Sequence, residues 1–281
     1  MKLVRWGPST QERPGVLGKD GAVRDLSGWI SDICGVTLGA HSLKRLRGID
    51  VSKLPTVAPG TRLGPPVAGS GKFVCIGLNY SDHAAEAGVP VPDEPVIFSK
   101  ATSAISGPND DVILPKGCLK ADWEVELGVV IGTTTQYVSV ENALDRVAGY
   151  LVVNDLSERH FQMERSGQWI KGKSADTFGP IGPWLVTRDE IPNPQALRMT
   201  LDVNGRRFQN GSTATMIFPV AMLVSYVSQF MSLQPGDIIS TGTPPGVGLG
   251  QKPPVWLKPG DEMVLSIAGL GTQRQHVRAL E

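Results

Sequence analysis

Apolar residues at alternate positions predict a strand within the run 122–132. Four of them, between Val125 and Ile131, favour extended structure, and a glycine closes the run. Because the side chains of a strand alternate between its two faces, we expect Glu124 and Glu126 to point to the same side.

Two carboxylates beside an apolar run repel each other and lose hydration, which disfavours their charged forms. A divalent cation offsets this cost best, and an all-oxygen ligand set suits a hard ion such as Mg²⁺, Mn²⁺ or Ca²⁺. A solvated edge strand with its acidic face in water would show the same pattern. The spacing of the two glutamates alone leaves both interpretations open.

Other hydrophobic patterns predict short strands separated by a few helices. Further strands are expected at 71–80, 95–100, 150–155 and 197–203. Helical spacing of apolar residues predicts helices at 81–88, 140–148 and 215–233. Two Pro-Gly turns, at 235–236 and 259–260, each lead into another strand. The pattern therefore predicts a mixed α/β, β-rich fold.

A segment rich in proline and glycine, at 58–66, divides the chain. We predict a small N-terminal α+β module at 1–65 and a larger domain at 66–281. The module contains no recognisable chemistry, so we interpret it as a packing or dimer-supporting unit.

Composition narrows the class of protein. The 281 residues carry no formal net charge, which argues against an electrostatic role on nucleic acid or acidic membranes. The 33 glycines and 22 prolines are spread along the chain, as many turns between strands require. The three cysteines form no CxxC pair, which favours neither disulfides nor a zinc site. The lack of a disulfide pattern predicts a reducing, cytoplasmic setting, and residues 1–8 show no apolar core of a signal peptide.

A histidine and a glutamate stand three residues apart in the predicted helix 81–88. His83 and Glu86 therefore lie on one helical face. A carboxylate beside an imidazole fixes the tautomer of the ring and raises its basicity, as a water-activating base requires. A surface His–Glu pair without function would show the same spacing.

More charged residues stand at or near the ends of predicted strands. Asp155 follows an apolar strand, where its carboxylate could join those of Glu124 and Glu126. The planar guanidinium of Arg159 matches a substrate carboxylate, although a structural salt bridge would explain it equally. Lys100 also ends a strand.

Five motifs, taken in order, resemble the fumarylacetoacetate hydrolase family over about residues 70–280. They are Gly77-Leu-Asn-Tyr-Ser-Asp-His83-Ala-Ala-Glu86, Trp123-Glu124-Val-Glu126-Leu, Asn154-Asp155-Leu-Ser-Glu-Arg159-His-Phe-Gln162, Gly172-Lys173-Ser-Ala-Asp-Thr177 and Gly236-Asp-Ile-Ile-Ser-Thr241-Gly-Thr243-Pro. The resemblance implies a C-terminal β-roll domain, a homodimer or homotetramer, and Mg²⁺ or Mn²⁺ held by Glu124, Glu126 and Asp155. His160 stands where relatives often carry Asp, a departure that could retune the pocket.

The resemblance also implies a small 2-oxo acid or β-diketone substrate, from which we derive a hypothesis for the chemistry. The Lewis acidity of the ion would stabilise the enolate that forms when a C–C bond breaks. His83, oriented by Glu86, would take a proton from water, and the hydroxide would attack the more distant carbonyl. Lys173 would add positive charge near the enolate. The polar ends of the substrate would be held by Lys100, Arg159, Gln162, Thr177 and Thr243.

Within the family, the chain most resembles the bacterial sugar-acid branch. That branch hydrolyses 2,4-diketo-3-deoxy acids, such as L-2,4-diketo-3-deoxyrhamnonate, to pyruvate and a second acid, here lactate. A ureidoglycolate lyase, an oxaloacetate decarboxylase or a hydroxymuconate-type isomerase would use the same metal ligands. The His83–Glu86 pair favours hydrolysis, because decarboxylation needs no activated water. A non-catalytic metabolite-binding protein is the alternative from another class.

Overall fold

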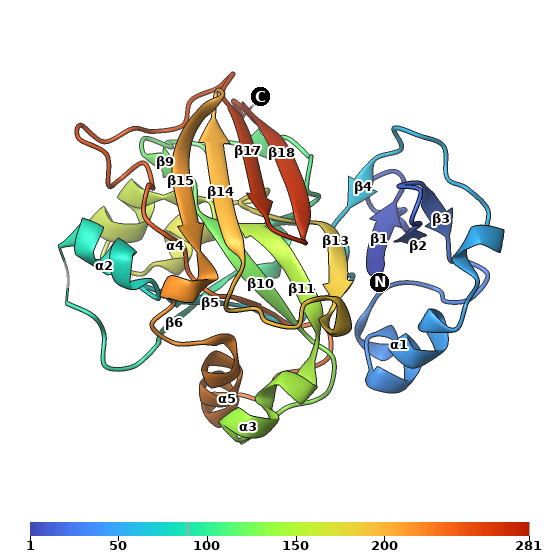
Figure 1. Ribbon diagram of the computed structural model, residues 1–281. Helices are drawn as coiled ribbons and strands as arrows, with labels where there is room; N and C mark the ends of the chain where they lie inside the picture. Colours follow the sequence, from blue (N-terminus) through green and yellow to red (C-terminus); the bar gives the residue numbers. More distant parts are fainter. Residues whose placement is uncertain (89, 281) are drawn as a thin grey trace.

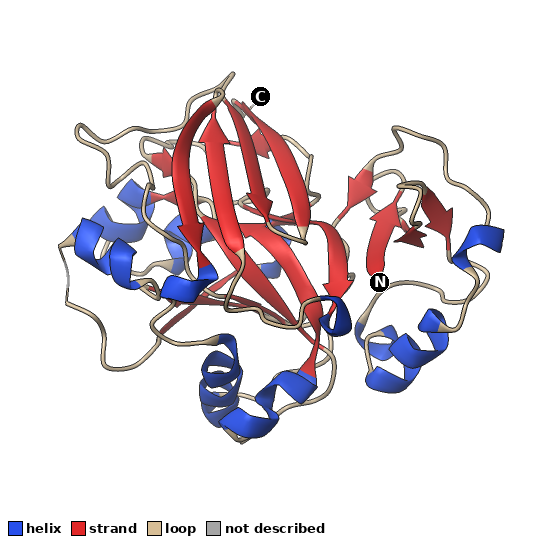
Figure 2. Cartoon of the chain, viewed as in Figure 1, coloured by secondary structure: helices blue, strands red, loops and turns tan. Residues whose placement is uncertain are grey.

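A large sheet runs through the molecule in the computed structural model, which describes residues 1–88 and 90–280 (Figures 1 and 2). Its strands follow the order β3-β2-β1-β13-β11-β10-β16-β5-β6, with β4 beside β1 and β7 beside β13. The bounds are β1 Lys2–Trp6, β2 Arg13–Leu17, β3 Val23–Asp25, β4 Leu63–Gly64, β5 Phe73–Gly77, β6 Val96–Lys100, β7 Ile105–Ser106, β10 Val125–Ile131, β11 Val147–Asn154, β13 Gly179–Thr187 and β16 Ile238–Ser240. The mixed α/β, β-rich fold class is confirmed.

Strands β10 and β11 lie at the centre of this sheet and are buried along their whole length. Their antiparallel register pairs Val125 with Asn154. Alternate apolar residues of β10 pack into one hydrophobic cluster, while Val130 packs into the other, so apolar groups cover both faces. Burial on both faces explains why this stretch is apolar at nearly every position. It also excludes the solvated edge strand that the sequence had left open for Glu124 and Glu126, because both are buried.

A second sheet packs against the first through Met199 and Leu265, which share a hydrophobic cluster with Val125. Its order is β15-β14-β17-β18-β8, and Figure 1 shows its longer strands in orange and red in front of β10 and β11. The Asn204-Gly205 turn joins β14 to β15, and both residues have positive φ. The bounds are β8 Val112–Ile113, β14 Arg198–Val203, β15 Arg206–Ser212, β17 Glu262–Ile267 and β18 Gly271–Arg278, with β9 Ala121–Asp122 and β12 Ser157–Glu158 forming a separate pair.

Short helices flank the sheets, and α3 and α5 pack together at one end (Figure 1). The α-helices are α1 Ala40–Arg47, α2 Ser81–Ala87, α3 Val140–Ala143, α4 Ile170–Lys173 and α5 Val220–Phe230, and a π-helical turn spans His160–Glu164. The predicted helix at 81–88 is confirmed as α2, which ends at Gly88 with a φ of 66°. No helix in the described ranges combines the length and hydropathy that a membrane crossing needs.

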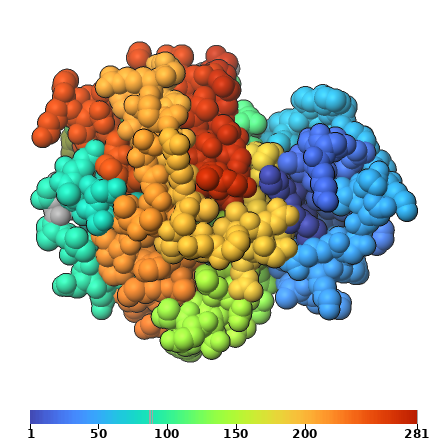
Figure 3. All heavy atoms as spheres, in the orientation of Figure 1, coloured from blue at the N-terminus to red at the C-terminus, as the bar shows by residue number. Residues whose placement is uncertain are grey.

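The N-terminal residues form a lobe beside the larger body, coloured blue in Figure 3. Strand β1 pairs with β13, Leu3 lying opposite Leu185, so the large sheet continues into this lobe. The Pro/Gly-rich segment contains β4, which pairs with β1. The division at residue 65 remains a prediction.

Two predicted helices differ from the structure. The α-helix expected at 140–148 stops at Ala143, and the strand β11 begins at Val147, whose backbone is paired with Ile131 of β10. The helix expected at 215–233 begins only at Val220, after Pro219, which disfavours helical geometry in the residue before it.

Candidate active site

Three carboxylates meet where β10 and β11 approach one another. Oxygen atoms of Glu124, Glu126 and Asp155 all lie within 4.8 Å of one another, and all three residues are buried. The β10–β11 register brings them together, and the Asp155 backbone N–H donates to the Glu124 carbonyl at 2.9 Å. The sequence suggested that Asp155 could join the two glutamates, and the pairing of the strands brings the three carboxylates together.

Buried cations contact two of these carboxylates. The Lys173 ammonium lies 2.6 Å from Glu124 Oε2 and 2.8 Å from Asp155 Oδ2. Lys100 forms a second ion pair with Asp155 and donates to the Leu156 carbonyl at 2.9 Å. Such buried charges are tolerated only when they are paired and hydrogen-bonded.

Arg159 connects the cluster to a fourth buried carboxylate. Its Nη2 lies 2.7 Å from Glu124 Oε1, and its Nε donates to Asp122 at 2.8 Å. Its Nη1 donates to Gln162 Oε1 at 3.0 Å, which the π-helical turn makes possible. The guanidinium is therefore held by protein groups on three sides, so the structural salt bridge considered above is present.

The pKa values of Glu124 and Glu126 are shifted in opposite directions. Burial raises the pKa of Glu124, but the charges of Arg159 and Lys173 outweigh it and hold that pKa well below its usual value. Burial, followed by repulsion from Asp155 and Glu124, raises the pKa of Glu126 well above its usual value. Glu126 accepts hydrogen bonds from the Ser240 hydroxyl at 2.6 Å and the Gly242 N–H at 2.9 Å, but it has no ion pair among the described residues.

These oxygens fit a divalent cation. Four carboxylates, including Asp122, face the three cations Lys100, Arg159 and Lys173, which leaves one negative charge when all are ionised. The unpaired charge lies on Glu126, where a cation would relieve the repulsion. Hard oxygen donors suit Mg²⁺ or Mn²⁺. Bound at this cluster, a divalent ion would leave one net positive charge for an anionic substrate.

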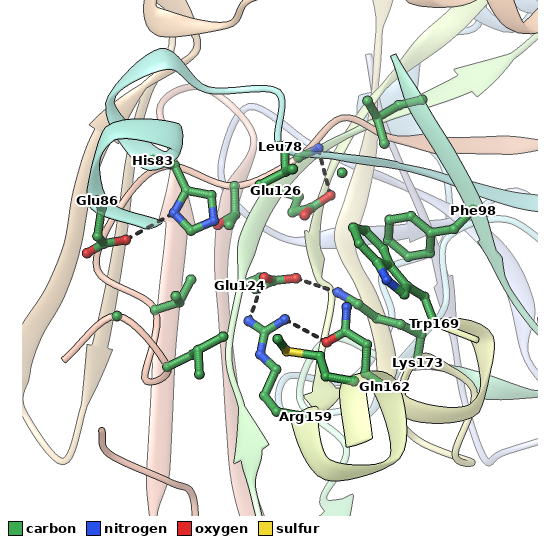
Figure 4. A pocket seen from close by; sticks show the side chains of 18 of the residues that line it. Leu78, His83, Glu86, Phe98, Glu124, Glu126, Arg159, Gln162, Trp169 and Lys173 are labelled. Carbon is green, nitrogen blue, oxygen red and sulfur yellow. Dashed lines mark hydrogen bonds and ion pairs between the residues drawn. The ribbon is translucent and has the colours of Figure 1, made fainter. Parts of the chain in front are cut away.

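His83 and Glu86 form the pair that their spacing predicts. Glu86 Oε2 lies 3.0 Å from His83 Nδ1, and Glu86 Oε1 accepts the Gly246 N–H at 2.9 Å (Figure 4). A carboxylate acceptor favours a proton on Nδ1, which leaves Nε2 as the basic nitrogen. The pair therefore has the geometry that a general base and the carboxylate that orients it would need.

One cavity of about 460 Å³ joins the pair to the carboxylate cluster. Figure 4 shows His83 and Glu86 on one side, Glu124 and Glu126 at the centre, and Phe98 and Trp169 on the other side. The two aromatic rings meet edge to face, with 5.2 Å between their centroids. The cavity is lined by Ile76, Gly77, Leu78, His83, Glu86, Phe98, Glu124, Glu126, Arg159, Gln162, Met163, Trp169, Lys173, Gly242, Thr243, Val247, Leu249, Gly250, Gln251 and Lys252.

The residues expected to hold substrate do not all reach this cavity. Arg159, Gln162 and Thr243 line it, and the Thr243 hydroxyl already donates to the Val125 carbonyl at 2.9 Å. Lys100 is fully buried behind Asp155. Thr177 lies outside the lining, where its hydroxyl accepts the Ile113 N–H at 2.8 Å. Lys100 and Thr177 therefore support the site from outside the cavity.

Sequence reasoning missed Asp122, the aromatic wall and Lys252. Asp122 stands directly before the Trp-Glu-Val-Glu motif, so its position next to two glutamates was an available signal. Phe98 and Trp169 are far apart in the chain, and only the approach of β6 to α4 brings them together. Lys252 lies in the long loop before β17, where no local pattern marks it.

Comparison with known proteins agrees with this geometry. The model of the fumarylacetoacetate (FAA) hydrolase C-terminal family matches residues 72–278. A protein of Burkholderia lata, provisionally named a hydrolase, is 60% identical over 279 residues and covers 99% of both chains.

Solved structures are similar over the whole chain. Fumarylacetoacetate hydrolase from Exiguobacterium antarcticum is 35% identical with a TM-score of 0.86, covering 100% of both chains. Maleylpyruvate hydrolase from Sphingobium sp. SYK-6, in complex with manganese(II) and pyruvate, is 28% identical with a TM-score of 0.83 over 100% of both chains. A probable 2-hydroxyhepta-2,4-diene-1,7-dioate isomerase from Mycobacterium abscessus is 32% identical with a TM-score of 0.82, again over 100% of both chains. The protein belongs to the fumarylacetoacetate hydrolase family.

Proposed function

We propose that this protein is a metal-dependent hydrolase that cleaves the C3–C4 bond of a 2,4-diketo acid and releases pyruvate. The observation that carries the proposal is the His83–Glu86 pair, which lines the same cavity as the carboxylate cluster. A decarboxylase would need the cluster alone, whereas hydrolysis also needs a group that activates water. The Sphingobium relative, solved with manganese and pyruvate, supports both the metal and the product.

Different residues of the chain carry out different parts of the proposed reaction. Glu124, Glu126 and Asp155 would hold Mg²⁺ or Mn²⁺, which supplies Lewis acidity to stabilise an enolate. His83 Nε2 takes a proton from water while the oxygen of that water attacks C4. The C3–C4 bond then breaks, C4 leaves as a carboxylic acid, and the proton returns to C3 to give pyruvate.

Lys173 and Arg159 have different parts in this scheme. Burial lowers the pKa of Lys173, but Asp155 and Glu124 outweigh it and raise that pKa overall, so the ammonium stays charged. It therefore contributes a fixed positive charge beside the enolate. Arg159 is already paired on three sides, so we assign it the orientation of Glu124 and Gln162 as well as contact with the substrate.

We propose a 2,4-diketo-3-deoxy sugar acid, such as L-2,4-diketo-3-deoxyrhamnonate, as the substrate, with lactate as the second product. The cavity is small and presents amide and hydroxyl groups, from Gln162, Gln251 and Thr243. These features suit a substrate whose acyl arm, the part from C4 onward, is short and hydroxylated.

A second candidate substrate is a diketo acid whose acyl arm ends in a carboxylate. Lys252 lines the cavity, and among the described residues it has no carboxylate partner, unlike Arg159 and Lys173. Gly250, two residues before Lys252, lies against Glu86. Lys252 is therefore near the His83–Glu86 pair, which would face the part of the substrate beyond C3. The maleylpyruvate hydrolase named above supports this candidate.

The test compares purified protein on three substrates, with Mn²⁺, with Mg²⁺ and with chelator. The substrates are 2,4-diketo-3-deoxyrhamnonate, maleylpyruvate and oxaloacetate, and NMR follows both products. Metal-dependent pyruvate with lactate supports the sugar acid, and pyruvate with maleate supports the second candidate. Pyruvate from oxaloacetate alone would replace the hydrolase with a decarboxylase. Loss of a dienoate absorbance without pyruvate, in a parallel assay on 2-hydroxyhepta-2,4-diene-1,7-dioate, would replace it with an isomerase.

A further inference from the structure

Asp122 is a buried carboxylate that the proposed reaction does not use. Its exposed fraction is 0%, and it lies outside the cavity lining. Oδ1 accepts the Trp123 N–H at 2.8 Å and the Gly248 N–H at 2.6 Å. Oδ2 accepts Arg159 Nε at 2.8 Å and the Leu249 N–H at 3.1 Å. One side chain thus accepts from the site arginine and from two backbone groups of a single loop.

That loop, residues 246–249, also holds the general-base pair. The Gly246 N–H donates to Glu86 at 2.9 Å, and the Trp123 indole donates to the Gly246 carbonyl at 3.2 Å. The loop is tightly packed, because a Cβ on Gly246 would lie 2.0 Å from the Phe208 carbonyl oxygen. A loop fixed this closely transmits a displacement at one end to the other.

Asp122 also fixes the orientation of Arg159. Because Nε points to Asp122, the two terminal nitrogens are directed to Glu124 and Gln162. The same carboxylate therefore contacts the group that orients a proposed metal ligand and the loop that orients Glu86.

We propose that Asp122 is a positioning residue that aligns the His83–Glu86 pair with the carboxylate cluster, acting through the 246–249 loop and Arg159. The inference rests on the proposed role of His83 as the base. The competing explanation is that Asp122 only balances the charge of Arg159. In that case its removal would lower stability but would not alter the pair.

Asp122→Asn is the informative variant, because it keeps the volume but replaces one acceptor oxygen with an NH₂ group. We expect kcat to fall by about tenfold or more, as for a displaced catalytic pair. Combined with Glu86→Gln, it should cost less than the product of the two single effects, because the part that acts through the 246–249 loop and Glu86 is already lost, while only the part that acts through Arg159 remains. Effects on kcat that multiply in the double variant would overturn the proposal.

Asp237→Asn is the matched control. Asp237 is equally buried, accepts the backbone N–H groups of Lys72 at 2.8 Å and Gln234 at 2.7 Å, and pairs with the Lys72 ammonium. It lies outside the cavity lining. Its variant should lower the melting temperature, leave kcat unchanged, and combine additively with Glu86→Gln.

A second readout does not depend on turnover. The ¹⁵N resonances of the His83 imidazole report its tautomer, and the chain has only four histidines to assign. Asp122→Asn should shift them toward the spectrum of Glu86→Gln, whereas Asp237→Asn should leave them as in the unmodified protein. An unshifted His83 spectrum in folded Asp122→Asn would overturn the inference, even if no diketo acid proved to be a substrate.

Trp123→Phe keeps the experiment decisive if Asp122→Asn does not fold. It removes the indole N–H that donates to the Gly246 carbonyl, so the same loop loses a different hydrogen bond. The same His83 shift and the same non-additivity with Glu86→Gln are expected. A folded Trp123→Phe protein with an unchanged His83 spectrum would count against transmission through the loop.

Discussion

Lys173 and Glu124 form a buried ion pair, with 2.6 Å between Nζ and Oε2. Arg159 pairs with the other oxygen of the same carboxylate, and Lys173 also reaches Asp155. Glu126, in contrast, has hydrogen-bond donors but no cation among the described residues. Glu124 is therefore paired with two cations, whereas Glu126 is paired with none among the described residues.

Glu126→Gln should stabilise the metal-free protein at a pH above the raised pKa of Glu126, because there it removes a buried charge that has no counter-ion. It should also abolish the increase in melting temperature that Mn²⁺ gives the unmodified protein, since one ligand is lost. Melting curves with chelator and with Mn²⁺ measure both effects. Asp155→Asn is the contrasting variant: it leaves Lys100 and Lys173 underpaired and should destabilise the metal-free protein by about 3–5 kcal/mol. Equal destabilisation by the two variants would contradict this charge assignment.

Metal binding should weaken as the pH falls. The folded-state pKa of Glu126 is raised, so its contribution to metal-free stability is complete below its ordinary pKa and is lost as the pH rises through the raised value. In that window a metal must displace a proton from Glu126. Calorimetry with Mn²⁺ in two buffers of different ionisation enthalpy should show proton release. In Glu126→Gln this release should disappear, and release that persists would assign the proton to another group.

His83→Ala and Glu86→Gln should each lower kcat for diketo-acid cleavage by about 10²–10⁴-fold, the usual contribution of a general base. Affinity for Mn²⁺ should be unchanged, because neither residue belongs to the carboxylate cluster. His276→Ala is the control, since His276 also lies near a glutamate, Glu262, but on the exposed face of strand β18. Full activity of His83→Ala would remove water activation from the mechanism.

Gly77→Ala should raise KM, because a Cβ there would lie 2.6 Å from the Trp169 ring and push this wall of the cavity. Displacing Trp169 would also disturb Phe98, which lies under the Lys173 ammonium with 5.1 Å between Nζ and the ring centroid. Gly28→Ala is the control, because a Cβ at Gly28 meets nothing within 4 Å. Steady-state kinetics of both variants measure this change in KM. An unchanged KM in a folded Gly77→Ala protein would show that the wall does not contact substrate.

The sequence alone predicted the β-rich class, several of the strands, the helix α2 and the spacing that pairs His83 with Glu86. These features are local, because alternation along a strand and the three-residue spacing of a helix bring neighbours together without help from the rest of the chain. The helices at 140–148 and 215–233 were predicted too long. There, tertiary pairing of Val147 and the conformational limit before Pro219 prevailed over hydrophobic spacing.

Tertiary structure alone decided which charges meet. The sequence suggested that Glu124, Glu126 and Asp155 act together, but the register of β10 against β11 is what brings them into one cluster, and the fold placed Lys100 and Thr177 behind the cavity. Asp122 gained its contacts from Arg159 and from a loop more than a hundred residues away in sequence. Such contacts depend on burial and on the pairing of distant strands, and neither leaves a periodic pattern in the sequence.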